Sequence, residues 1–514
     1  MTLALRSGTA WGDVWGRCLR AAPEAFHDDR VRNLWAGAWQ SGGRVLPATS
    51  PVDGSPLAGA PGLGADTARR AVRAALDQHR AWRVVPVAER RARVSAALDA
   101  LGEHRMLLAL LLVWETGMPW RIAQAEVDRG LDGVRWYVGE IDDMIEWRRP
   151  LPGPVGNIAG WNHPVSVVVH ALLVQALAGN AVIARAPTEG GPACLTLACA
   201  LIAREDVPVT LVSGGDELAA VLVRAPEVGC VCSLGARDAV GSTACAGADP
   251  SRRHVLQQEG LNAWGVWDYS DWSSLAGHLR AAFRHGKQRC TAYPRFVVRR
   301  DLLPDFLSAY LPAVRAVRLG HPLAVDDPGD DLPDLDFGPL INAARAKELG
   351  DLVGEAVDRG AIALHRGSLD GARLLPGQDT SAYLAPVTLL NPPRASPLHH
   401  TQPFGPVDTI VTVDTETELI AAMNASDGAL VATLSTDDEA AYARLAPRIR
   451  AFKVGHNRPR SRGDRAELFG GLGASWRGAF VGGELLVRAV TRGPADERPP
   501  GNFPDYHLMP PEAG

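Results

Sequence analysis

The chain has 514 residues, of which 46% are hydrophobic and 22% are charged. This is the composition of a globular protein, and the length suggests about three structural units, because single cores stop growing well below it. With 53 Lys and Arg against 58 Asp and Glu, the net charge is −5, so no positive field attracts nucleic acid or anionic lipid. We expect neither nucleic acid nor a membrane as a partner.

The cysteines and the N-terminus point to a reducing compartment. Seven cysteines, an odd number, lack the dense spacing of a secreted disulfide framework, and no two pairs stand at zinc-site spacing. The N-terminal segment has no apolar core of a secretory signal, and polar residues interrupt the apolar run 165–186. The sequence therefore predicts a cytoplasmic protein without a bound metal.

The order of elements predicts an α/β fold. Apolar residues at three- and four-residue spacing predict helices across 64–128. From Gly153 onward, short apolar stretches closed by Gly, Asn or Pro alternate with helical periodicity, which is typical of a doubly wound parallel sheet that binds nucleotides. A second alternating unit follows Cys290. The segment GGELLVRAVT is predicted as a short apolar strand before a Pro-rich, irregular tail.

Cys290 is the first candidate for chemistry. It lies in HGKQRCTAYPRFVV, close in sequence to Lys287 and Arg289. Cationic neighbours lower the pKa of a thiol and so favour the nucleophilic thiolate. A lone cysteine is more often a buried structural residue, so Cys290 becomes informative only together with other motifs.

Several stretches occur in a specific order along the chain. They are GPVGNIAGWNHP, GNAVIARAPTEG, HVLQQEGLNAW, GKQRCTA, QPFGPV and FGGLGASWRG. From about residue 40 to residue 493 they resemble the aldehyde dehydrogenase superfamily. Its matching stretches are a W-N-x-P turn, a G-N-x-V-V-x-K strand, an E-L-G-G turn, a G-Q-x-C nucleophile, E-x-F-G-P and F-G-G-x-x-x-S-G. The stretches CTAYPRFVV and FVGGELLVRAVT resemble the PaaN-like branch, of phenylacetic acid degradation.

The resemblance implies a fold with a Rossmann-like cofactor domain, an α/β catalytic domain and a small oligomerisation flap. The expected boundaries are 1–130 and 153–256 for the NAD(P)-binding domain, 257–478 for the catalytic domain, 131–152 and 479–495 for the oligomerisation segments, and 496–514 for the tail. The apolar strand ELLVRAV would be an exposed edge in a lone subunit, so a homodimer or homotetramer is expected.

The resemblance also implies oxidation of a small-molecule aldehyde to a carboxylic acid. The Cys290 thiolate would attack the aldehyde, and the Asn162 amide and the Cys290 N–H would hold the oxyanion. A fixed donor of this kind contributes on the order of 3 kcal/mol. Hydride would then pass to NAD(P) and leave a thioester. Read without the family, Asn162 is an Asx-turn residue before Pro164.

The general base that cleaves the thioester is ambiguous. Counted without gaps from AWGVW, Gln257 takes the place of the family's Glu, whereas a short deletion puts Glu259 there. A Gln side chain accepts no proton at neutral pH. Two alternatives follow: a CoA-acylating dehydrogenase, in which a thiol resolves the thioester, and a degenerate member that binds nucleotide or acts as a scaffold.

Residues for the adenosine end of the cofactor are Arg185, Thr188 and the Gly235–Ala236 turn, where backbone N–H groups would meet the pyrophosphate. Thr188 aligns with the acid that binds the ribose hydroxyls in NAD-preferring members. Without that carboxylate a 2′-phosphate is not repelled, which mildly favours NADP over NAD. A one-residue shift would restore the acid as Glu189.

Residues for the nicotinamide end are Trp161, Gln402 and Phe404. Gln402 replaces the Glu that usually contacts the ribose, so that contact loses its charge. Phe404 would pack on the nicotinamide side, and as a core aromatic it would need no cofactor.

Overall fold

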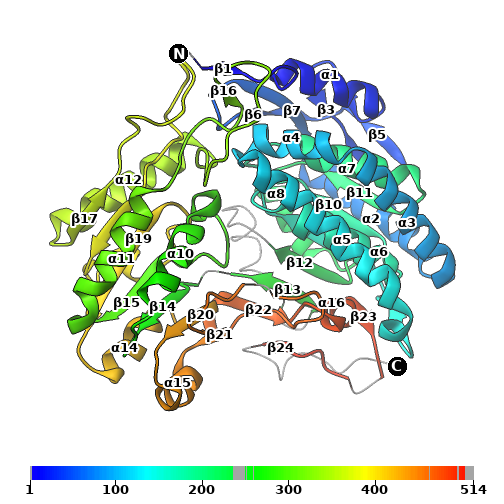
Figure 1. Cartoon of the computed structure of the whole chain (residues 1–514). Coiled ribbons are helices and arrows are strands. Elements are labelled where there is room, and N and C mark those ends of the chain that lie inside the picture. The colour runs from blue at the N-terminus through cyan, green and yellow to red at the C-terminus, as the bar shows by residue number, and fades with distance from the viewer. Residues whose placement is uncertain are drawn as a thin grey trace.

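The structure is a computed structural model that describes residues 3–234, 249, 252–258, 260–461, 463–494 and 497–503. Two halves, each built on its own sheet, lie side by side in Figure 1. The chain passes from the first sheet to the second after β13, which ends at Gln257, and β14 begins at Ala263. The α/β fold class expected from the sequence is confirmed.

The first half contains a nine-stranded sheet in the order β24-β22-β13-β12-β9-β10-β11-β4-β5. Its five central strands are parallel, and the outer pairs are antiparallel. The strands are β4 (Asn33–Trp35), β5 (Ala38–Gln40), β9 (Val155–Ala159), β10 (Val182–Arg185), β11 (Val209–Val212), β12 (Cys230–Leu234), β13 (His254–Gln257), β22 (Trp476–Ala479) and β24 (Gly501–Asn502).

The strand order contains a reversal next to β9. From β9 the chain adds β10 and then β11 on one side, whereas β12 and β13 are added on the other side. In open α/β sheets such a reversal leaves a crevice at the carboxyl ends of the two strands that flank it. β9 and β12 therefore point their carboxyl ends at the expected ligand site.

Helices cover both faces of the sheet, so its parallel strands β9, β10 and β11 are buried throughout, and β12 and β13 are buried except at their carboxyl ends. Adjacent residues of β10 serve opposite faces: Ile183 joins the apolar cluster under α2 and α8, and Val182 joins the larger cluster on the other face. These helices are α2 (Ala65–Trp82), α3 (Val87–Glu103), α4 (Arg105–Thr116), α5 (Trp120–Ile145), η1 (Pro164–Val169), α6 (His170–Leu177), α7 (Ala193–Arg204) and α8 (Asp216–Arg224).

The predicted helices across 64–128 are confirmed, and their ends follow local rules. Prolines precede α3 and α5, where a missing N–H costs nothing. α4 is leucine-rich and buried from Leu107 onward, and it ends at Gly117, whose φ of 70° is the left-handed cap that glycine adopts easily.

The second half contains a seven-stranded sheet in the order β17-β18-β19-β15-β14-β20-β21, parallel except for the β17–β18 pair. Its strands are β14 (Ala263–Val266), β15 (Arg295–Arg299), β17 (Ile362–Arg366), β18 (Val387–Leu390), β19 (Val407–Val413), β20 (Ala429–Ser435) and β21 (Ala451–His456). Its helices are α10 (Trp272–Ala282), η2 (Arg284–Lys287), η3 (Arg300–Leu302), α11 (Leu303–Arg315), α12 (Ala343–Asp358), α13 (Pro397–His400), α14 (Glu416–Met423), α15 (Glu439–Leu445) and η4 (Ala446–Arg448).

Smaller elements complete the fold. They are α1 (Trp11–Ala21), η5 (Gly473–Ser475) and α16 (Glu484–Ala489), the pair β1 (Ala4–Leu5) and β16 (Ala324–Val325), the group β2 (Phe26–His27), β3 (Arg30–Val31), β6 (Arg44–Thr49) and β7 (Pro56–Gly62), and the pair β8 (Arg149–Pro150) and β23 (Thr491–Arg492).

The segment GGELLVRAVT was expected as an apolar strand, and that expectation is wrong. Residues Glu484–Ala489 form helix α16, and only Thr491–Arg492 form a strand, which pairs with β8. The helix begins after two glycines with positive φ, and its leucines are buried against the body of the subunit. Burial rather than strand pairing therefore explains the apolar run.

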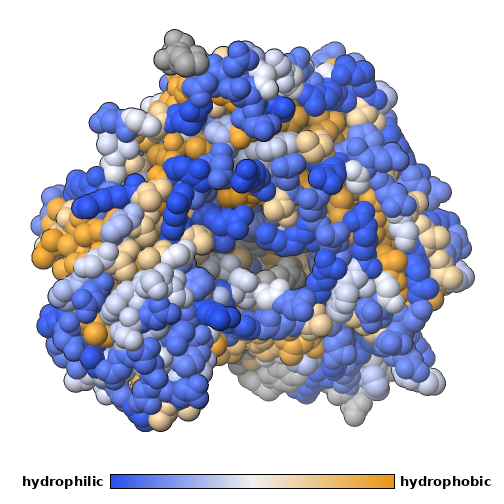
Figure 2. All heavy atoms as spheres, in the orientation of Figure 1, coloured by the Kyte–Doolittle hydropathy of each residue, from blue (hydrophilic) through white to orange (hydrophobic). Residues whose placement is uncertain are grey.

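The face of the molecule in Figure 2 is hollowed between the two halves, and mainly hydrophilic residues border the hollow. No helix of the described residues is long and apolar enough to cross a membrane.

Candidate active site

Cys290 follows a turn with an unusual backbone. His285, Gly286 and Lys287 have φ values of 55°, 58° and 58°, so three successive residues lie in the left-handed region. Such a conformation is costly for residues with a Cβ and persists only where the surroundings hold it. Here the His285 N–H donates to the carbonyl of Asp336 at 2.9 Å. The chain is thereby turned so that Cys290, which is half-buried, faces a cavity.

Lys287 does not act on the Cys290 thiol as the sequence suggested. Its Nζ lies 2.5 Å from Oδ1 of Asp408, and both side chains are buried. The same ammonium donates to the carbonyl of Tyr293 at 2.9 Å and lies 4.2 Å from the ring centre of Phe283. Its charge is therefore balanced by Asp408, and Lys287 anchors the turn.

Arg289 is the second of the two cations that lie near Cys290 in the sequence. It lines the same cavity as Cys290, and its Nη2 donates to the carbonyl of Ala282 at 3.1 Å. Burial lowers the pKa of Arg289 to about 10, the neighbouring Arg284 lowers it as well, and a negative charge on Cys290 acts in the opposite direction. Arg289 stays cationic at neutral pH and favours the thiolate form of Cys290.

Asn162 and the Cys290 segment are brought together, as the resemblance implied. Asn162 is fully buried, and its Nδ2 donates to the carbonyl of Gln288 at 3.2 Å. The Gln288 side chain in turn accepts from the N–H of Ile341 at 3.0 Å and donates to the carbonyl of Pro339 at 3.2 Å. The side-chain amide of Asn162 is thus held against Gln288, the residue two positions before Cys290.

Asn262 is a buried residue of the site that sequence reasoning missed. It donates to the carbonyls of Cys290 and Ala292, and its Oδ1 accepts from the N–H groups of Leu430 and Val431. The available signal was a polar amide between Leu261 and the buried strand β14, where an apolar residue is the usual choice.

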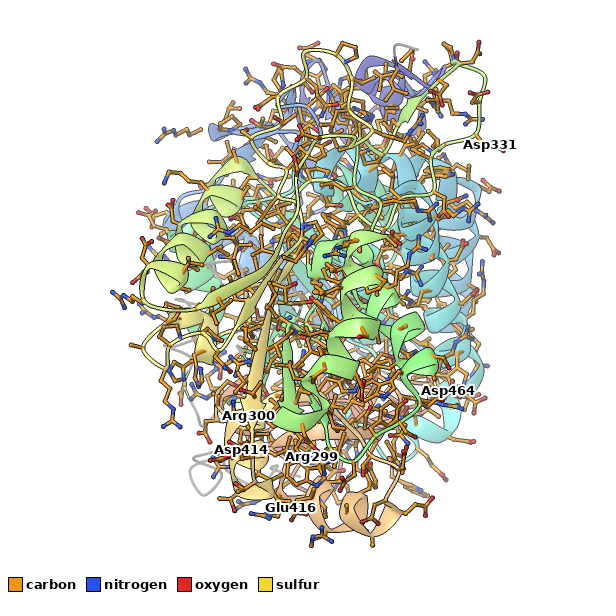
Figure 3. The ribbon with its side chains drawn as sticks, turned by 60° about the vertical axis from the view of Figure 1, so that its left-hand side comes forward. Arg299, Arg300, Asp331, Asp414, Glu416 and Asp464 are labelled. Atoms are coloured by element: carbon orange, nitrogen blue, oxygen red, sulfur yellow. The ribbon has the colours of Figure 1, made fainter. Side chains whose placement is uncertain are left out.

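A cavity of about 440 Å³ extends from Cys290 between the two halves. Gln257, His163, Arg129, Arg289 and Asp464 are among the residues that line it. Asp464 lies beside the cyan helix α5, which carries Arg129 (Figure 3). The cavity wall therefore contains cations, two acids (Asp464 and Glu467) and two imidazoles (His163 and His170) around one thiol.

Of the two candidates for the general base, Gln257 lies among the described residues and Glu259 does not. Gln257 ends strand β13 and lines the cavity of Cys290. Its neighbour Gln258 is exposed, with its N–H bound to the carbonyl of Ser475. Glu259 lies outside the described residues. The end of β13 thus presents the side-chain amide of Gln257 to the cavity.

The nicotinamide-side candidates form one group near the thiol. Trp161 is buried, and its ring packs edge-on against Phe404 with centroids 6.0 Å apart. Ile341 completes this small apolar cluster. Gln402 donates from Nε2 to the carbonyl of Arg289 at 2.8 Å, so it supports the residue next to Cys290.

The adenosine-side candidates lie at the carboxyl end of β10. Arg185 is fully buried, and its Nε donates to the carbonyl of Gly214 at 3.1 Å. Thr188 is exposed just beyond it, whereas Glu189 is partly buried and accepts from Asn342 Nδ2 at 3.4 Å. Thr188 is thus the more accessible side chain of this turn. The Gly235–Ala236 turn lies outside the described residues.

These positions fit a dinucleotide. β9 leads into Trp161 and Asn162, β10 into Thr188, and β12 ends at Leu234, which lines the cavity of Cys290. The carboxyl ends at the reversal of the strand order therefore surround the thiol cavity, which is where doubly wound sheets bind nucleotides. The residues present are compatible with a bound NAD(P).

A second feature missed from the sequence is a buried acid beside the cavity. Glu126, on α5, accepts hydrogen bonds from Nδ1 of His163 at 2.9 Å and from both the N–H and the hydroxyl of Ser166, at 2.9 and 2.7 Å. Its signal in the sequence was a carboxylate among apolar positions of a helix face, next to Val127.

Comparisons with known proteins agree with this geometry. Mitochondrial succinate-semialdehyde dehydrogenase of Oryza sativa subsp. japonica is 26% identical over 428 residues, covering 79% of this chain and 78% of that protein. The structure of NADP-dependent glyceraldehyde-3-phosphate dehydrogenase from Bacillus halodurans C-125 complexed with NADP matches with a TM-score of 0.79 at 23% identity, covering 90% of this chain and 98% of that one. Lactaldehyde dehydrogenase from Escherichia coli matches with a TM-score of 0.78 at 22% identity, covering 90% and 97%.

The structural matches establish the shared fold. The family model for the aldehyde dehydrogenase family matches residues 39–492, which is most of the chain. The chain therefore belongs to the aldehyde dehydrogenase family, whose members oxidise aldehydes with NAD(P).

Proposed function

We propose that Cys290 is the nucleophile of an NAD(P)-dependent aldehyde oxidation and that Asn162 is the oxyanion donor. The observation that carries this proposal is the hydrogen bond of 3.2 Å between Asn162 Nδ2 and the carbonyl of Gln288, which holds the amide beside the Cys290 segment. In the reaction, the thiolate of Cys290 adds to the aldehyde carbon, and the new oxyanion is stabilised by the Asn162 amide and the Cys290 N–H.

Bound NAD(P) supplies the hydride acceptor. The protein's part is to hold the aldehyde carbon on the sulfur with its C–H bond toward the group formed by Trp161, Ile341 and Phe404. Loss of hydride converts the adduct to a thioester on Cys290. Hydrolysis then forms a C–O bond, breaks the C–S bond and releases the carboxylate with regenerated Cys290.

Gln257 bears on how the thioester is resolved. It lines the cavity at the end of β13, and an amide does not take a proton from water. This favours slow hydrolysis unless another group is the base, and it keeps a second candidate function, transfer of the acyl group to the thiol of CoA. Turnover with and without CoA distinguishes the two.

For the cofactor we propose that NADP binds at least as well as NAD. Thr188 is exposed beyond β10, and it carries no charge that would repel a 2′-phosphate. The partial burial of Glu189 and its contact with Asn342 support placing Thr188, rather than Glu189, against the ribose.

We also propose a homodimer or homotetramer in the cytoplasm. Among the described residues, the small sheet of β8 and β23 pairs with no third strand, and next to it Trp147 is 86% exposed with a φ of 62°. A large exposed aromatic held on a strained turn fits a subunit interface. Sedimentation velocity tests this: Trp147→Ser should form a smaller assembly than wild type and so have a lower sedimentation coefficient.

The test of the proposed function is NAD(P)H formation with a panel of aldehydes that includes aromatic aldehydes and semialdehydes. The PaaN-like stretches are the reason for including aromatic aldehydes. Wild type should form NAD(P)H with at least one member of the panel, and Cys290→Ala should form none while still binding NAD(P). Turnover by Cys290→Ala would contradict the assignment.

A further inference from the structure

Glu126 and His163 form a hydrogen-bonded pair in the wall of the cavity that contains Cys290. His163 directly follows Asn162, and its side chain, which is 13% exposed, lines the cavity. Glu126 lies behind it, is 2% exposed and is bonded to His163 Nδ1 at 2.9 Å. The carboxylate is thus shielded from the cavity by the imidazole that it orients.

The carboxylate of this pair is ionised. Burial raises the pKa of Glu126, but the charge of a protonated His163, its hydrogen bond and the bonds from the hydroxyl and N–H of Ser166 outweigh burial and hold that pKa at about 2. The hydrogen bonds from Nδ1–H of His163 and from Ser166 remain when His163 is neutral. A carboxylate can only accept, so the proton of a neutral His163 stands on Nδ1. Nε2 then carries the free lone pair. This is the arrangement of a histidine base that is oriented by an acid.

The other described groups in the cavity are less suited to take a proton. The second imidazole, His170, is 7% exposed, and its ring packs edge-on against Tyr137 with centroids 5.5 Å apart. Asp464 is exposed to solvent, and its Oδ1 accepts from the N–H of Arg465 at 2.7 Å. Gln257 is an amide. Glu467 lies 2.9 Å from Lys453 and also pairs with Arg460. Burial raises the pKa of Glu467, but these cations lower it below its usual value. Arg129 and Arg289 are cations.

We propose that His163 is the general base of thioester hydrolysis, in the role that Gln257 cannot take. This proposal rests on the proposed function of Cys290. Water adds to the thioester carbon while its proton moves to Nε2 of His163. The tetrahedral adduct then breaks its C–S bond, the Cys290 thiolate leaves, and His163 returns the proton to solvent. Glu126 is a positioning residue that keeps the proton on Nδ1.

The test uses 4-nitrophenyl acetate, an activated ester that acylates a reactive thiolate without NAD(P) or a particular aldehyde. The first turnover releases 4-nitrophenolate as a burst, and the later rate reports hydrolysis of acyl-Cys290. His163→Asn is the central variant, because its amide can still donate to Glu126 but has no basic nitrogen. His163→Gln, His163→Ala and Glu126→Gln complete the set.

We expect His163→Asn to keep the burst of about one equivalent per subunit and to lose the steady rate by on the order of 10²-fold. Glu126→Gln should give a smaller loss of the same step. His163→Ala should recover part of the steady rate when free imidazole is added, which a structural role would not produce. Melting curves confirm that each variant is folded.

Three results would overturn the proposal. The first is a wild-type steady rate in both His163→Asn and His163→Gln. The second is an equal loss of burst and steady rate in these variants, which would place His163 in acylation or in folding. The third is an intact rate in His163→Asn together with a burst and slow hydrolysis in Glu259→Gln, which would make Glu259 the base. Absence of any burst in wild type would instead refute the proposed nucleophile.

Discussion

Asn262 donates hydrogen bonds from Nδ2 to the carbonyl oxygens of Cys290, at 2.7 Å, and of Ala292, at 2.8 Å. Its Oδ1 accepts from the N–H groups of Leu430 and Val431, at 3.2 and 3.1 Å. One buried amide therefore joins the Cys290 segment to strand β20. The position of the thiol therefore depends, through this contact, on the seven-stranded sheet that contains β20.

Asn262→Ala should lower the free energy of unfolding by about 3 kcal/mol, because it leaves buried carbonyl and N–H groups without partners. It should also reduce kcat/KM for aldehyde. Denaturant unfolding and steady-state kinetics measure the two effects. Asn262→Asp keeps the acceptor and loses the donor, so it should damage kcat/KM while it retains the contacts to β20. Wild-type kinetics in both variants would separate Asn262 from the position of the thiol.

Thr188→Glu should shift the cofactor preference from NADP to NAD, because a carboxylate at this exposed turn repels a 2′-phosphate and accepts from ribose hydroxyls. We expect a change in the ratio of the two Kd values of at least about tenfold, measured by fluorescence titration. Glu189→Gln is the matched control and should leave the ratio unchanged. If the control changes the ratio and Thr188→Glu does not, Glu189 is the ribose contact.

Gln257→Glu should accelerate thioester hydrolysis on the order of tenfold or more by supplying a carboxylate at the end of β13. The steady rate after the burst measures this. Gln258→Glu adds the same charge at the exposed neighbouring position and should have no effect. If CoA raises the wild-type steady rate and Gln257→Glu lowers that response, acyl transfer to CoA is the wild-type function.

Glu115 gives stability a dependence on pH. It lies in the last turn of α4, buried against the first turn of α7. Burial raises its pKa to about 8, although the N–H groups of Cys194 and Ala193 lower it. A carboxyl group with a raised pKa stabilises the fold fully below its unfolded pKa of about 4.5, and this contribution is lost as the pH rises through about 8.

The side chain of Glu115→Gln stays uncharged at every pH. The free energy of unfolding of this variant minus that of wild type should therefore be larger at about pH 8.5 than at about pH 5.5. Denaturant unfolding at both values measures the difference. Glu103→Gln removes an exposed carboxylate on α3 and should follow wild type at both. Parallel behaviour of Glu115→Gln and wild type would show that Glu115 keeps its charge in the fold.

Local patterns and ordered motifs predicted the alternating α/β fold, the helices of 64–128 and the proximity of Asn162 to Cys290. These patterns failed where tertiary contacts determine the secondary structure or the direction of a side chain. An apolar run such as Leu485–Val487 reads alike as a strand or a buried helix, and packing selects the helix. Lys287 is near Cys290 in sequence, but three left-handed residues turn its side chain to Asp408.

The contact between Glu126 and His163 could not be predicted from the sequence for a related reason. The two residues are 37 positions apart, and the contact forms only because α5 packs against η1. A buried carboxylate can be suspected from its apolar neighbours, but its partner cannot be read from one sequence.

The most direct test of the central claim is rapid mixing of the enzyme with NADP and an aldehyde from the panel, followed by mass spectrometry of the quenched protein. Wild type should form about one NADPH per subunit in a burst and carry the acyl group on Cys290. Cys199→Ala, which alters a buried cysteine of α7, should behave as wild type, and Cys290→Ala should show neither burst nor adduct. An undiminished burst in Cys290→Ala, or an acyl group on another residue, would contradict the account.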